Sequence, residues 1–414
     1  MVTSVISAGD AANLGVQTTG GNDGVLVLRS GAAGAKVDAL SIAASGTATF
    51  VGEVAGVSAI NSGQIGGRRN IIYNGEMKVA QRSASETGLG AAAGYFTLDR
   101  WKTLVGATSA GRFTMAQVAD GPAGFANCLK LTTTTADTSI AAGEYLLLTQ
   151  LIEGQDLQQL KKGTASAEQV TVSFWVKGNA AAVYVYELQD VDNNRVIQQS
   201  FAVTTSWNRI ELTFAADTTG AFGDDNGSSL YINIWLHAGS TYAGGTFASN
   251  TWTSITQANR AAVDGFTSIF DATSRTLFIT GVQMEIGATA TEFESRTYGE
   301  ELALCQRYTW KYGGNISDEY LVGVGFYADG NQIIFGYIQH PVRMRTTPTL
   351  TVVGSPQVKT NGGATTGFTP VISAPSALGG MINMQKTSHG LTASSVTSLN
   401  CGATTDHFFF VAEL

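Results

Sequence analysis

The sequence is poor in charge and in proline. Charged residues make up 14% of the chain of 414, against roughly a quarter in an average soluble domain, and 6 prolines stand beside 49 glycines. This composition favours short strands joined by tight turns over a helical protein. The net charge is −8, and no Lys/Arg run is longer than a pair, which argues against a phosphate-binding surface. We therefore expect no nucleic-acid partner.

Cysteine, a leader and long apolar runs are also scarce. The three cysteines, Cys128, Cys305 and Cys401, have no metal-ligand spacing and predict free, packed thiols. The start "MVTSVISAGDAAN" has neither a basic region nor an apolar one, and no apolar run approaches the roughly 18–20 residues that span a bilayer. We expect a chain that is made in a cytoplasm and not inserted into a membrane.

Motifs of catalysis are missing as well. His237, His340, His389 and His407 have no nucleophile or carboxylate motif near them, and GxSxG, HExxH and a P-loop are absent. No repeat of about 20–50 residues indicates the parallel β-helix of a polysaccharide-cleaving spike. We expect no enzyme activity and no cofactor, although two acids distant in sequence can still meet in a fold.

Two acidic loops offer oxygen ligands at alternating positions, as calcium loops do. They are "DVDNN" (190–194) and "GDDNGSS" (223–229). Turns rich in Asp and Asn explain them equally well. No metal site is predicted, and calcium binding stays open.

Residues 1–67 contain one aromatic residue, Phe50, among Ala, Gly, Ser, Thr and Val. So few large side chains cannot bury enough surface to fold as an independent domain. The pieces "GVLVLRS" and "ATFVGEV" nevertheless alternate as strands do, which a flexible linker does not need. We expect an oligomeric shaft or docking segment that shares its core with other chains.

All six tryptophans lie between Trp101 and Trp310, which marks the main folded body. Its strand candidates are 128–133, 145–152, 170–178, 182–190, 195–203, 209–216, 230–239 and 275–287. We expect an all-β chain in which these strands form an antiparallel jelly-roll sandwich. The predicted domains are an N-terminal segment (1–67), the sandwich (68–298), a helical linker (299–312) and a smaller β-domain (313–414).

The stretch "VTVSFWVKG" (170–178) raises the question of function. Alternation places Val172, Phe174 and Val176 on one face, which leaves Trp175 on the polar face. Strands 230–239 and 278–287 likewise carry polar and aromatic residues opposite their apolar faces. If the three strands share a sheet, one surface presents Trp175, Lys177, Tyr231, Asn233, Trp235, His237, Gln283 and Glu285.

Indole rings among amides, a carboxylate and a histidine suit a sugar, whose C–H face stacks while its hydroxyls form hydrogen bonds. This surface is the predicted glycan-binding site. The alternative is that a loop or a neighbouring subunit covers the face and that its tryptophans are structural.

Several pieces resemble bacteriophage and prophage tail-fibre proteins of the receptor-binding kind. They are "NIIYNGEMKVAQR" (70–82), "LDRWK" (98–102), "VTVSFWVKG", "ITGVQMEIGATATEFESRTYGEELALCQRY" (279–308), "HPVRMRTTPTLTV" (340–352) and the terminal "FFFVAEL". As an ordered set they cover roughly residues 68–414. The first part of this stretch also resembles jelly-roll carbohydrate-binding modules attached to glycosidases.

The resemblance implies a virion protein, a homotrimeric tail fibre that attaches to the host by binding a bacterial surface glycan. Its N-terminal part would dock to other virion proteins. A head fibre or capsid decoration protein uses similar folds and is the first alternative. A polysaccharide-degrading tailspike is the second.

Overall fold

The computed structural model describes residues 68–414, except 108, 330–331, 361–362 and 387–396, together with four strands within residues 17–50. The chain forms two compact units, Met1–Asn61 and Ser62–Leu414. In the first, an antiparallel meander contains β1 (Gln17–Gly20), β2 (Leu26–Ser30), β3 (Val37–Ile42) and β4 (Ala48–Phe50). The strand pattern predicted there is confirmed, and the role of the segment stays a prediction.

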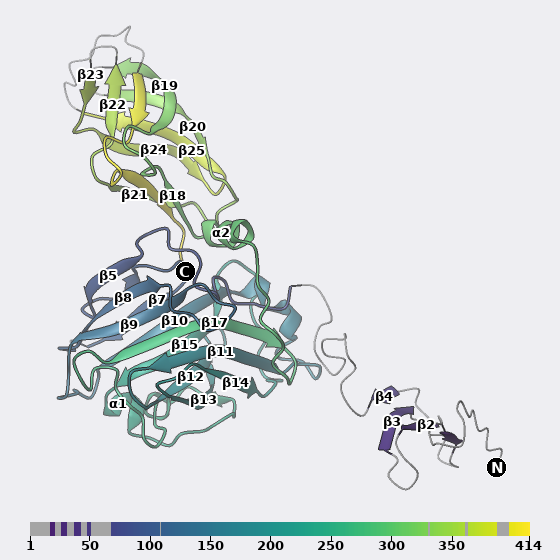
Figure 1. The fold of residues 1–414 in the computed structure, drawn as a ribbon. Coiled ribbons are helices and arrows are strands. Elements are labelled where there is room, and N and C mark those ends of the chain that lie inside the picture. Colours follow the sequence, from purple (N-terminus) through teal and green to yellow (C-terminus); the bar gives the residue numbers. More distant parts are fainter. Residues whose placement is uncertain are drawn as a thin grey trace. The chain divides into compact units, whose positions relative to one another are not determined.

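The second unit begins with a sandwich of two antiparallel sheets (Figure 1). The six-stranded sheet has the order β14 (Asn208–Phe214), β11 (Val170–Gly178), β17 (Thr276–Ile286), β9 (Cys128–Thr135), β8 (Arg112–Val118), β5 (Ser85–Leu89). The seven-stranded sheet has the order β16 (Thr253–Ser254), β13 (Arg195–Val203), β12 (Ala182–Asp190), β15 (Ser228–Ala238), β10 (Tyr145–Glu153), β7 (Lys102–Gly106), β6 (Gly94–Tyr95). The predicted all-β fold and its eight strand candidates are confirmed.

The core of the sandwich lies between the two sheets. Val172, Phe174 and Val176 of β11 are fully buried there, and they face Ile232 and Ile234 of β15. The predicted alternation therefore selects the correct inner faces. Short helical turns complete the sandwich: 3₁₀ turns at Gly154–Asp156, Gln158–Leu160 and Gln257–Asn259, and α1 (Ser240–Ala243).

Helix α2 (Tyr298–Gln306) follows the sandwich. Thr297 caps its first turn, because its hydroxyl accepts from the amide of Glu300 while the Glu300 carboxylate accepts from the amide of Thr297. This capping box starts the helix at Tyr298, one residue before the predicted helical linker (299–312). Among the described residues no helix has the length and apolar character that crossing a bilayer requires.

The remaining strands build a second core, apart from that of the sandwich. A three-stranded sheet has the order β18 (Thr309–Tyr312), β27 (His407–Val411), β21 (Thr349–Val353). A seven-stranded sheet has the order β23 (Gly363–Thr365), β22 (Gln357–Thr360), β26 (Thr397–Asn400), β19 (Tyr320–Asp329), β20 (Gln332–Gln339), β25 (Gly379–Gln385), β24 (Thr369–Ser376). Strands β19 and β20 pair with each other antiparallel. The predicted domain boundaries at 67, 298 and 312 stay predictions.

A buried ion pair joins the sandwich to this C-terminal part. Arg100 is fully buried, and its guanidinium donates to Glu413 at 2.5 Å and to the carbonyl oxygen of Leu151 at 2.5 Å. The guanidinium carbon lies 3.5 Å from the centre of the Tyr308 ring. Glu413 also accepts from Arg82 at 3.0 Å. The carboxylate of Glu413 thereby links the end of the chain to two arginines near the start of the sandwich.

We expect Glu413→Gln to destabilise the protein by about 3 kcal/mol, because it leaves the buried Arg100 guanidinium without its counter-charge. Urea denaturation followed by tryptophan fluorescence measures this. The control is Glu211→Gln, whose carboxylate pairs with Arg209 at 2.9 Å but is 49% exposed, and it should change stability by less than about 1 kcal/mol. Equal effects of the two substitutions would contradict the assigned role of Glu413.

Candidate functional site

The outer face of the six-stranded sheet carries a row of aromatic and basic side chains. Register places Phe278 of β17 opposite Lys130 of β9 on one side and opposite Lys177 of β11 on the other. Val176 pairs with Asn208, so Trp207, which directly precedes β14, continues the line beyond Lys177. Side chains paired across a sheet point to the same face. We call Lys130, Phe278, Lys177 and Trp207 the aromatic row.

Cations and rings alternate along the aromatic row at contact distance. The Lys177 ammonium lies 4.7 Å from the Phe278 ring centre and 5.0 Å from that of Trp207. The Lys130 ammonium lies 5.1 Å from the Phe278 ring on its other side. Such cation–π contacts each contribute roughly 0.5–1 kcal/mol at exposed sites. Asp120 fixes Lys177 further, with both carboxylate oxygens 3.0 Å from the ammonium.

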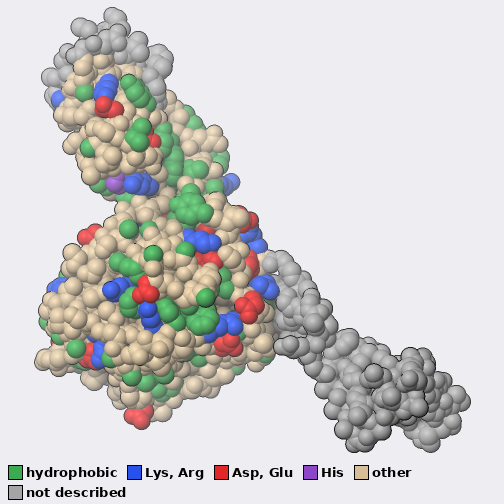
Figure 2. All heavy atoms as spheres, viewed as in Figure 1, with side chains coloured by type: hydrophobic (Ala, Val, Ile, Leu, Met, Phe, Trp, Pro, Cys, Tyr) green, Lys and Arg blue, Asp and Glu red, His purple; other side chains and the backbone are tan. Residues whose placement is uncertain are grey.

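The aromatic row is partly open to solvent. All four of its side chains are half-buried, and Asp120 beside them is exposed. The rings of Phe278 and Trp207 lie 6.3 Å apart at 72°, so they present differently tilted faces. Figure 2 shows hydrophobic side chains interspersed with charges of both signs over the sandwich. A mixed surface of this kind suits a neutral polar ligand better than a polyanion.

Trp175 lies beside the aromatic row, two residues before Lys177 on β11. It is half-buried and pairs with Arg209 on one side and Thr280 on the other. Its indole covers Gly281, where a Cβ would lie 3.1 Å from the Trp175 ring and 2.7 Å from Phe125. The largest side chain of β11 therefore fits the outer face because a glycine leaves room beneath it. Trp175 and Lys177 are the predicted residues that this surface contains.

The predicted single surface is wrong, because its strands belong to both sheets. β11 and β17 are neighbours in the six-stranded sheet, whereas β15 pairs with β10 and β12 in the other. Trp175, Lys177, Gln283 and Glu285 thus belong to strands of one sheet, and Tyr231, Asn233, Trp235 and His237 belong to a strand of the other.

Gln283 and Glu285 are buried and form hydrogen bonds with the loop that follows β17. Glu285 accepts from the amide of Thr291 at 2.8 Å and from its hydroxyl at 2.7 Å. Gln283 donates to Glu285 at 2.8 Å and accepts from the amide of Glu294 at 2.7 Å. Because both side chains are fully engaged beneath the loop, their predicted place on an open surface is wrong.

The outer face of β15 lies beneath residues 239–271, which we call the covering segment. Trp235 is fully buried against Tyr242, Val263 and Phe266 of that segment. The Arg260 guanidinium lies 4.8 Å from the Trp235 ring and donates to Glu187 at 2.9 and 2.5 Å. The exposure predicted for Trp235 is therefore wrong, and the alternative of a covering loop holds for this strand.

Asn233 belongs to the same buried layer. Its amide donates to Glu187 at 2.8 Å and to Gln189 at 3.2 Å, and its oxygen accepts from Thr149 at 2.8 Å. Tyr231, near the start of the strand, stays half-exposed. Because Asn233 is fully buried and both of its N–H groups are donated within the fold, it is not available to a sugar.

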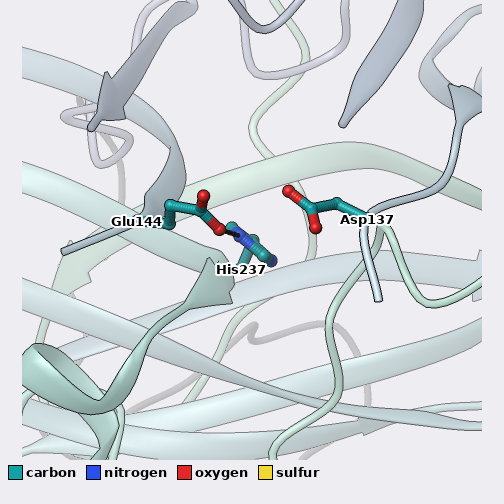
Figure 3. Close-up of side chains that lie close together, drawn as sticks. All are labelled: Asp137, Glu144 and His237. Carbon is teal, nitrogen blue, oxygen red and sulfur yellow. Dashed lines mark ion pairs between the residues drawn. The ribbon is translucent and has the colours of Figure 1, made fainter. Parts of the chain in front are cut away.

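His237 is displaced by a β-bulge. The pairing of β10 with β15 shifts between Leu146 and Leu147, so that Leu146 lies opposite His237 and Leu147 opposite Trp235. The ring of His237 consequently lies 5.1 Å from that of Phe270, a core residue. In Figure 3 it lies between the carboxylates of Glu144 and Asp137. Its predicted place on the outer face is wrong.

The two acidic loops meet at one end of the sandwich. The amide of Gly223 donates to Asp192 at 2.9 Å. The carboxylates of Asp190 and Asp217 lie 2.5 and 3.1 Å from the ammonium of Lys162. The ammonium of Lys162 thus balances the negative charge of these two carboxylates.

A surface hollow of about 380 Å³ adjoins these loops and is lined by Leu157, Gln158, Lys161, Lys162, Thr164, Ala221 and Phe222. The ring of Trp252 lines a smaller cavity of about 20 Å³, and its indole N–H is bonded to the carbonyl oxygen of Ala215 at 2.8 Å. The bonds of Lys162 and Trp252 are internal to the fold. The aromatic row, with its part-exposed rings, is therefore the stronger candidate site.

Sequence reasoning missed Phe278, Lys130 and Trp207. Simple alternation places Phe278 on the same face as Val282 and Met284, which is the core face. Gly281 has a φ of +62°, and the register with β11 shifts at this point, so the alternation reverses. A glycine inside a strand is the signal that predicts such a bulge.

No protein-family model matches the sequence, and no curated protein matches it significantly. Among solved structures, the family 11 carbohydrate-binding module of Clostridium thermocellum, in complex with a β-1,3-1,4-mixed-linked tetrasaccharide, aligns with 50% of this chain and 97% of its own, at 12% identity and a TM-score of 0.25. The module TmCBM61, in complex with β-1,4-galactotriose, aligns with 53% of this chain and 100% of its own, at 10% identity and a TM-score of 0.26.

The enzymatically active domain of tailspike protein 4 from bacteriophage CBA120 aligns with 53% of this chain and 21% of its own, at 14% identity and a TM-score of 0.27. At these scores the likenesses decide nothing about the ligand. The fold of this chain follows from its own two sheets and their strand registers, without these comparisons.

We expect Trp235→Ala to cost about 3–5 kcal/mol of stability, as truncation of a fully buried tryptophan does, while Trp175→Ala costs clearly less. The reason is that Trp235 is enclosed by the covering segment, whereas Trp175 is half-open to solvent. Urea denaturation of the two variants measures the difference. Similar losses in both would show that Trp175 is as structural as Trp235.

Proposed function

We propose that this protein binds a carbohydrate on the outer face of the six-stranded sheet, across the aromatic row and Trp175. The observation that carries the proposal is the line of part-exposed rings with a fixed ammonium between two of them. Indole and phenyl faces stack on the C–H face of a sugar, while ammonium and carboxylate groups bond its hydroxyls. Lys177 and Asp120 are placed for the second role.

The arrangement favours weak binding at one site. Each ring contributes on the order of 1 kcal/mol through stacking beyond the area it buries. The rings of Phe278 and Trp207 are held by strands and by Lys177, so little conformational entropy is lost when a ligand binds. When one virus particle carries several copies of the protein, binding at one site raises the effective concentration of glycan at the others. Sites that are weak singly then give firm attachment.

The finer proposal is a tail fibre that attaches a bacteriophage to a surface glycan of its host. Its support is the ordered set of tail-fibre-like pieces between residues 70 and 414 and the N-terminal segment built from small residues. In this proposal residues 1–67 dock to other virion proteins. A head fibre or decoration protein would use the same glycan-binding face.

We expect Trp207→Ala and Phe278→Ala to weaken glycan binding at least about fivefold, because each removes a stacking face worth about 1 kcal/mol or more. An array of bacterial surface polysaccharides identifies the ligand, and calorimetry with an oligosaccharide from the best hit gives the affinities. Circular dichroism verifies that the variants are folded.

The matched control is Tyr337→Ala, which removes a 59% exposed ring from the C-terminal part and should leave the affinity unchanged. If Tyr337→Ala weakens binding and Trp207→Ala does not, the site lies in the C-terminal part. We also propose that the glycan is bound and not cleaved. New reducing ends after incubation with the polysaccharide would instead favour a degrading tailspike.

We further propose that the chain is a homotrimer. Mass photometry at micromolar concentration should give three times the 43.3 kDa of the chain. Deletion of residues 1–61, one of the two compact units, should leave a folded β-protein that no longer incorporates into particles. A stable monomer of the full chain, or normal incorporation of the truncated one, would contradict this assembly.

A further inference from the structure

Asp137, Glu144 and His237 meet in a cluster that contains none of the residues of the aromatic row. Asp137 follows β9 of the six-stranded sheet, whereas Glu144 directly precedes β10 and His237 lies near the end of β15, both in the other sheet. One donor atom from each of the three lies within 4.8 Å of the others. Figure 3 shows the imidazole of His237 between the two carboxylates.

Neither carboxylate has a positive partner from a lysine or arginine among the described residues. Asp137 is 5% exposed and accepts from the Ser109 hydroxyl at 2.7 Å and the Ala110 amide at 2.8 Å. Glu144, also 5% exposed, accepts from the Ala141 amide at 3.0 Å.

One imidazole nitrogen of His237 is buried without a hydrogen-bond partner among the described residues. Its side chain is completely buried, and its Nε2 makes no hydrogen bond to the described residues although it lies 3.5 Å from a Glu144 oxygen. Nδ1 lies 2.7 Å from the Ser268 hydroxyl oxygen. A buried imidazole nitrogen that lies beside a carboxylate and has no hydrogen-bond partner is placed as a cation ligand.

We propose that Asp137, Glu144 and His237 bind one divalent ion of the zinc class. One imidazole nitrogen with two carboxylate oxygens is a ligand set that zinc accepts, whereas calcium and magnesium prefer oxygen alone. Ligands at about 2.0–2.1 Å from a tetrahedral zinc lie about 3.3 Å apart, close to the separation of His237 and Glu144. The Ser268 hydroxyl orients the imidazole through its other nitrogen, as outer-shell partners of metal-bound histidines do.

The burial of the cluster assigns the ion a structural role. Catalytic zinc sites keep a position open to substrate, and these three side chains are at most 5% exposed. The ion would tie the end of β9 in one sheet to β10 and β15 in the other. Ser268 belongs to the covering segment, and its hydroxyl oxygen also accepts from the amide of Phe270 at 3.0 Å. By holding His237, which contacts Ser268, the ion would also fix this segment. The site is independent of glycan binding.

The test uses the full chain, stripped with a chelator and titrated with Zn²⁺ alone. We expect one zinc per chain by calorimetry and by elemental analysis after dialysis, together with a rise in melting temperature. Co²⁺ in place of zinc should give the visible absorption of a low-coordinate site. Glu144→Gln and Asp137→Asn keep the side-chain shape, and each should weaken zinc binding by at least about 100-fold, since loss of even outer-shell partners costs 10–100-fold.

The matched control is His340→Gln. His340 is also buried with an unbonded Nε2, but it lies against the rings of Trp310 and Phe410 and not between carboxylates. Its substitution should leave zinc binding unchanged. The proposal is overturned if the stripped chain takes up no zinc at micromolar concentration, if it binds Ca²⁺ in preference to Zn²⁺, or if Glu144→Gln and Asp137→Asn bind zinc like the unaltered chain.

Discussion

The buried ion pair between Arg260 and Glu187 decides which face of the sandwich is available to a ligand. Glu187 stands on the outer face of the seven-stranded sheet, and Arg260 brings the covering segment down onto it with two hydrogen bonds. Trp235 and Asn233 are enclosed beneath that contact. An unpaired charge at this depth would cost several kcal/mol, so the segment cannot lift without a large penalty. One outer face is therefore closed.

On the six-stranded sheet the outer face stays partly open at the aromatic row, and the chemistry of this surface follows from strand register. Because β9, β17, β11 and the start of β14 are neighbours, single side chains from four places in the sequence form one line. Lys177 between Phe278 and Trp207 holds the rings apart and in place. A rigid, part-exposed line of rings with charges of both signs beside it is a surface that hydroxyl-rich ligands can use.

Much of the fold was predictable, because strand alternation is a local property. It selects the inner residues of β11 and β15, and Thr297 with Glu300 marks the start of α2. The site was predictable in part, through Trp175 and Lys177. The rest depended on non-local facts: β15 lies in the other sheet, and bulges at Gly281 and next to His237 reverse the alternation. The cluster of Asp137, Glu144 and His237 has no spacing motif, since the connection between β9 and β10 supplies the two carboxylates and the distant strand β15 supplies the histidine.

The most direct test of a carbohydrate site on the open face is a crystal structure of residues 62–414 with the oligosaccharide that binds best in solution. These residues form one compact unit that contains the whole sandwich. The account predicts sugar density against Trp207 and Phe278, with hydroxyls bonded to Lys177 or Asp120. Density over any other surface, with the aromatic row left bare, would contradict it.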